Sequence, residues 1–255
     1  LLPQLKELVD NYKPSLIFSD AGEWLYDDTF WKTKEFLSWL YSKSPVKNEV
    51  VVNDRWCKGM PGNHGDYFSS EYEDARVDKL RKPWEESRGI GGSYGFNRAE
   101  NAEDYSSSEE LIIELTDIVS RGGNLLLNVG PTADGRIPVV MQERLLEIGD
   151  WLDVNGEAIY GTRKHSVSSI KDENQHLYFT SKENVIFCIF TKWNDKIEID
   201  LTSGEIVENV TLLGTNEKIN WVVGDDNRLI IEIPALTIDE IPCLHAWTFK
   251  ILLKE

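Results

Sequence analysis

The spacing of apolar residues changes once along this chain, near residue 160, and that change limits the folds open to it. Before it, short apolar runs alternate with segments that carry apolar residues at helical spacing, which indicates parallel strands joined by crossover helices. After it, the apolar residues follow a period of two, and no helical segment interrupts them. We therefore predict an α/β domain over residues 1–160 and an antiparallel β-sandwich over residues 161–255, with a boundary near Gly161.

The first region supplies only four or five strand–helix units, whereas a closed parallel barrel needs eight. Its first element is a helix with no strand before it, so we expect the chain to be the carboxy-terminal portion of a longer one. Strands are expected at 16–18, 50–52 and 125–127. Helices are expected at about 5–12, from Asp28 to just before Pro45, from the Ser107/Glu110 capping box to Gly122, and from Pro138 to Gly156.

The second region reads as a series of short strands with turn residues between them. The expected strands lie near 176–181, 185–191, 196–201, 207–213, 217–223, 228–233 and 245–253.

The charge of the chain excludes one class of partner. Its 255 residues carry a net charge of -17, and no Lys/Arg-rich stretch offsets it, so nucleic acid is not expected as a partner. No apolar run approaches the roughly 20 residues needed to cross a bilayer, so no membrane partner is expected. The sequon that begins at Asn209 is compatible with a secretory route, although such short sequons also arise by chance.

The cysteine and histidine residues do not form a metal-binding pattern. The three cysteines, Cys57, Cys188 and Cys243, are far apart in sequence and form no C-x-x-C, and the four histidines form no H-x-x-x-H pair. We expect neither a structural zinc, nor a disulfide framework, nor a cofactor.

Polar residues follow three of the expected strands at the point where each strand ends, at 19–24, 53–56 and 128–131. Catalytic residues of parallel α/β folds stand at the carboxyl ends of strands. Aromatic faces cover the apolar side of a sugar ring while carboxylates and arginine bind its hydroxyls, so these residue types suit a sugar site. The alternative is that Asp20 and Asp54 only form turns.

Residues 64–86 form an acidic and aromatic stretch that we interpret as a long loop. Glycoside hydrolysis needs one ionised and one protonated carboxyl, and Asp20 together with a glutamate of this loop meets that need. The alternative is that Glu73, Asp74, Glu85 and Glu86 are solvated surface charge, which we expect to hold for most of them.

Gly91-Gly92-Ser93-Tyr94-Gly95 matches G-x-S-x-G, the turn that presents a nucleophilic serine in α/β-hydrolases. That turn needs a strand before it and a helix after it. The charged residues before Ser93 predict no strand, and Phe96-Asn97-Arg98 predicts no helix, so a serine hydrolase built on Ser93 is only a distant alternative.

Several motifs, in fixed order, resemble the α-L-fucosidases of the retaining glycoside hydrolase family 29. They are Leu16-Ile17-Phe18-Ser19-Asp20, Val51-Val52-Asn53-Asp54-Arg55-Trp56, Ser70-Glu71-Tyr72, Trp84-Glu85, Tyr94-Gly95-Phe96-Asn97-Arg98, residues 122–131 and Asn155-Gly156-Glu157-Ala158-Ile159-Tyr160. The stretch at 44–50 is more similar to the lysosomal animal branch than to the bacterial enzymes.

The resemblance implies a fold class, α/β plus all-β: the carboxy-terminal part of a (β/α)8-like barrel followed by an antiparallel β-sandwich. It implies release of terminal α-linked L-fucose from glycans with retention. Asp20 matches the nucleophile, Glu71 the acid/base with Glu85 as its alternative, and Arg55 an arginine near the sugar. Retention requires the two carboxyls to lie about 5–5.5 Å apart.

The resemblance also implies partners and a location. The amino-terminal part of the barrel, with its sugar-holding residues, has no match here, so we expect a companion polypeptide that carries it, and association into a homo-oligomer is possible. The animal branch implies a lysosomal or secreted protein. The competing hypothesis is a non-catalytic fucosidase-derived carbohydrate-binding or structural protein.

Overall fold

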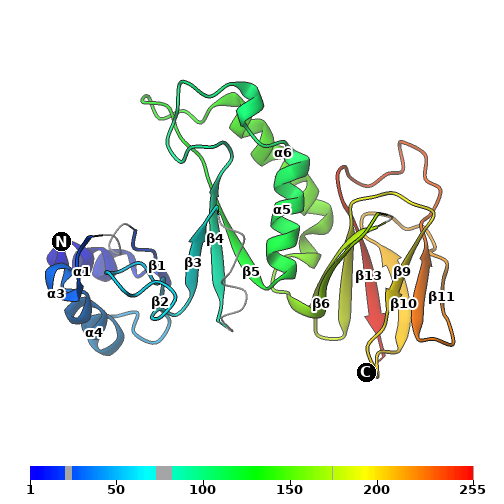
Figure 1. Cartoon of the computed structure of the whole chain (residues 1–255), viewed down its shortest axis with the longest axis horizontal. Coiled ribbons are helices and arrows are strands. Elements are labelled where there is room, and N and C mark those ends of the chain that lie inside the picture. The colour runs from blue at the N-terminus through cyan, green and yellow to red at the C-terminus, as the bar shows by residue number, and fades with distance from the viewer. Residues whose placement is uncertain (21–24, 73–81, 174, 255) are drawn as a thin grey trace. The chain divides into compact units, whose positions relative to one another are not determined.

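The computed structural model describes residues 1–20, 25–72, 82–173 and 175–254 (Figure 1). These residues form two compact units, Leu1–Ser87 and Arg88–Glu255, which we describe separately.

The first unit begins with helices that cover one face of a parallel strand pair. Its helices are α1 (Leu2–Tyr12), α3 (Asp28–Trp31) and α4 (Thr33–Lys43), and β1 (Leu16–Ile17) pairs in parallel with β2 (Val51–Val52). Apolar residues of α1, α4 and both strands form one buried cluster, in which Val9, Leu40 and Val52 are almost fully covered. The parallel pairing expected from the sequence is therefore present here.

The opposite face of the β1–β2 pair is open. Leu16 and Val51 are register partners on this face and are 48% and 38% exposed, whereas Val52, on the helix-covered face, is 2% exposed. Parallel sheets normally have both faces buried.

The single helix expected from Asp28 to Pro45 is two helices, so that prediction is wrong in this detail. Asp27 caps α3, and Lys32 adopts a left-handed conformation (φ 60°) that separates α3 from α4. The Thr33 hydroxyl donates to the main-chain oxygen of Trp56 at 3.0 Å. This long-range contact fixes the start of α4 and is not encoded in helical periodicity.

The stretch interpreted as a long loop contains two strands, β3 (Phe68–Glu71) and β4 (Trp84–Gly89), which pair in parallel. That interpretation is therefore wrong for these residues. Their buried positions include Ser70 and Glu86, 8% and 1% exposed, so the apolar alternation that identifies a strand is missing.

In the second unit, two long helices accompany one strand. They are α5 (Ser108–Ser120) and α6 (Val139–Asn155), with β5 (Gly123–Asn128) between them, and short 3-10 turns occupy Ala102–Asp104 and Gly156–Ala158. The predicted capping box is confirmed, because Ser107 accepts from the Glu110 amide and the Glu110 carboxylate accepts from the Ser107 amide. Pro138 precedes α6 and Gly156 follows it, as expected.

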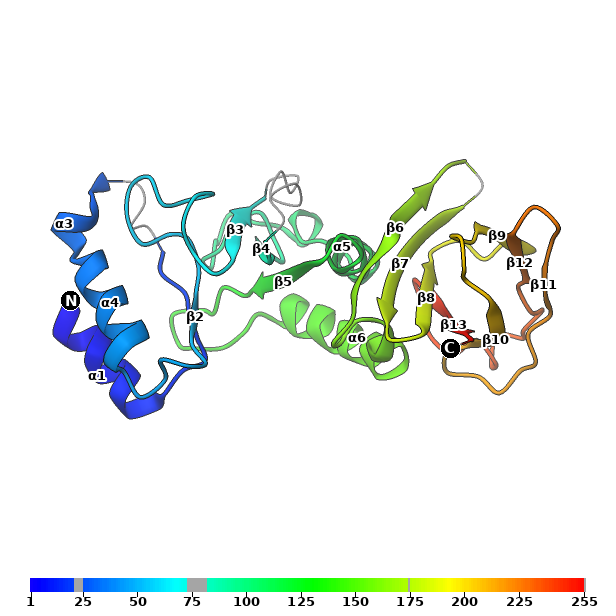
Figure 2. The ribbon, with the colours of Figure 1, turned by 90° about the horizontal axis from the view of Figure 1, so that it is seen from below.

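The rest of the second unit consists of two antiparallel sheets, which confirms the expected architecture of this region. Strands β6 (Arg163–Lys171), β7 (His176–Lys182), β8 (Val185–Phe190), β10 (Val207–Leu212) and β13 (Trp247–Leu253) form one sheet in the order β10-β13-β8-β7-β6. Strands β9 (Lys196–Asp200), β11 (Trp221–Val223) and β12 (Arg228–Glu232) form the other (Figure 2). The sequence pattern did not predict β6, whose residues are mostly exposed.

The larger sheet has apolar residues on both faces. Phe179, Cys188 and Phe249 belong to the core shared with the smaller sheet. Tyr178 and Ile189 pack instead in a cluster with residues of α5 and α6. The Trp151 indole of α6 donates to the main-chain oxygen of Ala246 at 2.8 Å. These contacts make α5, α6 and the sheets one compact unit.

Ser93 does not lie in a nucleophile turn, although a strand does precede it. The prediction of no strand over the charged residues 84–89 is wrong, because β4 runs there. No helix follows, however, since Phe96-Asn97-Arg98 is irregular, and the Asn97 side-chain amide donates to the Ser93 hydroxyl at 3.1 Å. The structure therefore lacks the helix that a serine hydrolase turn requires.

Candidate active site

The candidate site lies in the first unit, at the carboxyl ends of its parallel strands. Asn53, which is fully buried, exchanges two hydrogen bonds with the main chain of Ser19. Its side-chain oxygen accepts from the Ser19 amide at 2.9 Å, and its nitrogen donates to the Ser19 carbonyl at 2.7 Å. These bonds extend the β1–β2 pairing and fix the backbone immediately before Asp20.

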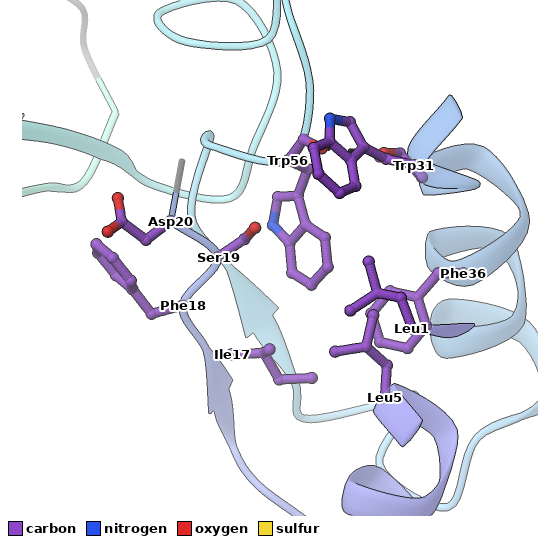
Figure 3. Close-up of a pocket in the computed structure, with 10 residues that line it drawn as sticks. Leu1, Leu5, Ile17, Phe18, Ser19, Asp20, Trp31, Phe36 and Trp56 are labelled. Carbon is purple, nitrogen blue, oxygen red and sulfur yellow. Dashed lines mark hydrogen bonds between the residues drawn. The ribbon is translucent and has the colours of Figure 1, made fainter. Parts of the chain in front are cut away.

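The side chain of Asp20 lies on the open side of β1. Figure 3 shows the Asp20 carboxylate next to the Phe18 ring, on the opposite side of the strand from Ile17. Ile17 faces an apolar cavity of about 230 Å³ that Leu5, Phe36 and Trp56 also line. Asp20 also borders this cavity, but its carboxylate points away from it. The candidate catalytic group of Asp20 therefore lies on the face of the β1–β2 pair that the helices do not cover.

Arg55 contacts both of the other predicted site residues, Asp20 and Glu71. Its Nη1 lies 3.5 Å from Asp20 Oδ1 and also contacts Glu71 Oε1. The guanidinium carbon lies 5.7 Å from the centre of the Phe18 ring, within cation–π range. Because both carboxylates touch the same nitrogen, they lie close to each other.

The three side chains differ in exposure. That of Arg55 is 8% exposed, whereas those of Glu71 and Asp20 are 33% and 61% exposed. The buried Arg55 cation therefore contacts two carboxylates, those of Asp20 and Glu71, that remain accessible to a ligand.

Glu85 lies on the same face of β3–β4 as Glu71. Ser69 and Glu85 are register partners, as are Glu71 and Ser87, and side chains alternate between the two faces of a strand. Within the described part of the chain, Glu85 Oε1 is buried without a hydrogen-bond partner. Burial raises the pKa of Glu85, and the nearby charge of Arg55 only partly offsets this. Glu85 is thus in surroundings that favour the protonated acid.

Some residues of this site were not predicted from the sequence. Ser69 accepts a hydrogen bond from Arg55 Nε at 2.7 Å, and Tyr67 lies close enough to Glu85 for that charge to contribute to a raised Tyr67 pKa, of which burial is the main cause. Their sequence carries no clear strand signal, because only Phe68 of the residues in β3 is apolar. Residues 21–24, which follow the first expected strand, and the acids Glu73 and Asp74 lie outside the described residues.

The described residues contain neither a candidate metal site nor a candidate membrane span. No group of three His, Cys, Asp or Glu side chains there is arranged to hold a metal ion. No helix there is long and apolar enough to span a membrane.

Family models match both regions of the chain. The model of the α-L-fucosidase family matches residues 1–157, and the model of the α-L-fucosidase C-terminal domain matches residues 171–252. The chain belongs to the α-L-fucosidase family. The first match contains Asp20, Arg55, Glu71 and Glu85, so the whole candidate site lies within the family's own domain.

The chain spans about half the length of the curated relatives it matches. It is 40% identical to the tissue and plasma α-L-fucosidases of Homo sapiens, over 253 and 259 residues. In each case the match covers 98% of this chain and 54% of the relative.

Solved structures of the family are similar in fold. An α-fucosidase from Thermotoga maritima, solved with a mechanism-based inhibitor, matches with a TM-score of 0.79 and 35% identity over 98% of this chain and 55% of that one. α-L-fucosidase isoenzyme 1 from Paenibacillus thiaminolyticus, at 24% identity and a TM-score of 0.81 over all of this chain and 61% of its own, supports the fold alone.

Proposed function

We propose that this chain forms part of a glycoside hydrolase that releases terminal α-L-fucose from glycans by a retaining double displacement. The observation that carries the proposal is the meeting of Asp20 and Glu71 at Arg55 Nη1, at the carboxyl ends of parallel strands in a chain of the fucosidase family. Two adjacent carboxyls are what retention requires.

Asp20 is proposed as the nucleophile. Its carboxylate is accessible and has the Arg55 cation beside it. It attacks the anomeric carbon of fucose, and the bond from that carbon to the leaving oxygen breaks while the acid gives its proton to that oxygen. Water then attacks the covalent fucosyl intermediate, and the same acid group, now ionised, removes a proton from the water.

Two glutamates compete for the acid/base role. Glu71, the residue predicted from the family motif, is supported by its contact with the Arg55 that Asp20 also touches. Glu85, the alternative, is supported by its raised pKa, because a general acid must hold a proton before the reaction starts. Replacing each glutamate by glycine and measuring rescue by azide separates the two.

The first region is proposed to be the carboxy-terminal part of a (β/α)8-like catalytic barrel over residues 1–160, followed by the sandwich domain over 161–255. Two parallel strand pairs, the open face that bears Leu16 and Val51, and relatives nearly twice as long support this. The occupant proposed for that face is the amino-terminal part of the family's barrel, carried by a companion polypeptide. Closing the barrel would bury the exposed strand face.

A lysosomal or secreted location is proposed from the tissue and plasma relatives. Asn209 of the sequon is exposed on β10, where a glycan would have room. Intact-mass analysis of the native material tests the glycan and the companion polypeptide together, and size-exclusion chromatography with light scattering tests for a homo-oligomer.

The decisive experiment is release of 4-nitrophenol from 4-nitrophenyl α-L-fucoside by the chain alone and with its companion polypeptide. We expect turnover with the companion, loss of it in Asp20→Asn, and α-configured fucose as the first product by NMR. Fucose binding without turnover would favour the non-catalytic alternative. The inverted anomer as first product would refute the double displacement.

A further inference from the structure

The hydroxyl of Ser69 lies between Asp54 and Arg55 and joins them. Arg55 Nε lies 2.7 Å from Ser69 Oγ, and Ser69 Oγ lies 2.8 Å from Asp54 Oδ1. A guanidinium can only donate, so the serine oxygen accepts from Arg55 and gives its own hydrogen to the aspartate. The direction of both bonds is therefore set.

Asp54 lies at one end of this series of hydrogen bonds and is held rigidly there. It is 1% exposed, its Oδ1 also accepts from the Ser69 amide at 3.1 Å, and its Oδ2 accepts from the Gly62 amide at 2.8 Å. Gly65 packs directly against it, since a Cβ on Gly65, at φ +140°, would lie 3.0 Å from Asp54 Cα. A buried carboxylate with three donors and no free space is a fixed anchor.

At the other end of this series of hydrogen bonds, the Arg55 guanidinium contacts the two candidate catalytic carboxylates. The guanidinium is planar, so a fixed Nε limits where Nη1 can lie. Nη1 is the atom that contacts both Asp20 and Glu71. Asp20 is the most exposed of the three, so it has the least packing of its own to orient it.

We propose that Ser69 is a positioning residue, anchored by Asp54, which orients the Arg55 guanidinium so that both carboxylates keep their reactive geometry. The inference rests on the proposed fucosidase function. Ser69 acts through Arg55 and has no part in bond breaking. Small misplacements of reacting groups cost as much as about a hundredfold in rate, so a single hydroxyl suffices for a large effect.

The adjacent residue provides a matched control. Ser70 is also a serine of β3, but its side chain lies on the opposite face, where its hydroxyl donates to the buried carboxylate of Glu86. Loss of either hydroxyl removes one side-chain hydrogen bond to a buried carboxylate. Only the Ser69 hydroxyl leads to Arg55.

The test compares Ser69→Ala, Ser69→Thr and Ser70→Ala in the chain together with its companion polypeptide. The measurements are kcat, KM and the pH profile on 4-nitrophenyl α-L-fucoside, and the melting temperature. We expect Ser69→Ala to lower kcat about 10- to 100-fold with KM within about twofold. We expect Ser69→Thr, which keeps the hydroxyl, to retain kcat within about threefold, and Ser70→Ala to lower the melting temperature while kcat is kept.

The pH profile separates positioning from general damage. If Arg55 moves away in Ser69→Ala, its charge no longer offsets the burial that raises the pKa of Glu85, so the limbs of the profile should shift. A change that is only structural lowers the amount of active enzyme and leaves the profile in place.

Several outcomes would overturn the inference. They are an unchanged kcat in Ser69→Ala, equal losses of kcat in Ser69→Ala and Ser70→Ala, or, once azide rescue has assigned the acid/base role to Glu85, a lower kcat with an unshifted pH profile. Any of these, with an active wild type, rejects the positioning role and leaves the proposed function standing. A wild type without turnover rejects both.

Discussion

The site face of the first unit and the sandwich core of the second bury very different residues. In the sandwich core, the fully buried positions are mainly apolar, with Phe190 and Phe249 both at 0% exposure. In the site, three consecutive polar residues, Asn53, Asp54 and Arg55, are 0%, 1% and 6% exposed. Burying polar groups costs free energy unless each is paired, and here each of the three is hydrogen-bonded within the site. The apolar core of the sandwich therefore serves stability, whereas the buried polar residues of the first unit organise a site.

The largest effect that this comparison predicts is on turnover, from Asp20→Asn. We expect kcat to fall by at least about a thousandfold, because the amide cannot act as the nucleophile. The melting temperature should stay within about 2 °C, since the side chain is 61% exposed. Enzyme kinetics and calorimetry measure the two quantities. A large loss of stability with turnover kept would assign Asp20 to the fold.

The next effect concerns the two glutamates, replaced by glycine one at a time. Loss of the acid/base should be rescued by azide when the substrate has a good leaving group, because azide attacks the fucosyl intermediate without needing a base. We expect at least about tenfold rescue in only one variant. Rescue in Glu71→Gly supports the motif-based role, and rescue in Glu85→Gly transfers the role to the residue with the raised pKa.

The formation of fucosyl azide, detected by NMR, is the control for this rescue. Rescue in neither variant would contradict both candidates.

A substitution in the sandwich core should lower stability and leave turnover unchanged, which is the opposite of the result expected for Asp20→Asn. Phe249 is fully buried and stacks on Phe190 with ring centres 5.0 Å apart. We expect Phe249→Ala to lower the free energy of unfolding by about 3–5 kcal/mol, because it leaves a cavity in an apolar core. Turnover per folded molecule should not change. Denaturant unfolding with active-site titration tests this, and a fall in kcat of the folded fraction would break the proposed separation of roles.

The smallest predicted effect is at the capping box of α5. Ser107→Ala should cost about 1 kcal/mol of stability, as the loss of an N-cap does. The hydrogen bonds from the Ser107 main chain and hydroxyl lower the pKa of Glu110, so the Glu110 contribution is present above its unfolded pKa of about 4.3. It is lost as the pH falls through the lower folded value.

Only the bond from the Ser107 hydroxyl to the Glu110 carboxylate depends on the ionisation of Glu110. The stability difference between the wild type and Ser107→Ala should therefore be smaller at pH 3 than at pH 7, as measured by unfolding at both pH values. An equal difference at both pH values would contradict the role of Glu110. Glu109→Gln, which removes a neighbouring charge outside the capping box, is the matched control.

Prediction from the sequence succeeded where local rules govern structure. The box at Ser107 and Glu110, the limits of α6 at Pro138 and Gly156, and most of the sandwich strands follow from caps, breakers and apolar alternation. It failed where long-range contacts decide. Lys32 divides one helix into two, and β3 and β4 pair although their buried residues include Ser70 and Glu86.

The sequence by itself determined the family, the two kinds of secondary-structure pattern and the residues that carry chemistry, because motifs and periodicity are properties of neighbours along a chain. Only the tertiary structure decided that Arg55 joins Asp20 to Glu71, that Ser69 and Asp54 support that arginine, and that Glu85 Oε1 is buried with no hydrogen-bond partner among the described residues. These contacts connect residues 14 to 35 positions apart or depend on burial. Distance and desolvation exist only once the chain has folded.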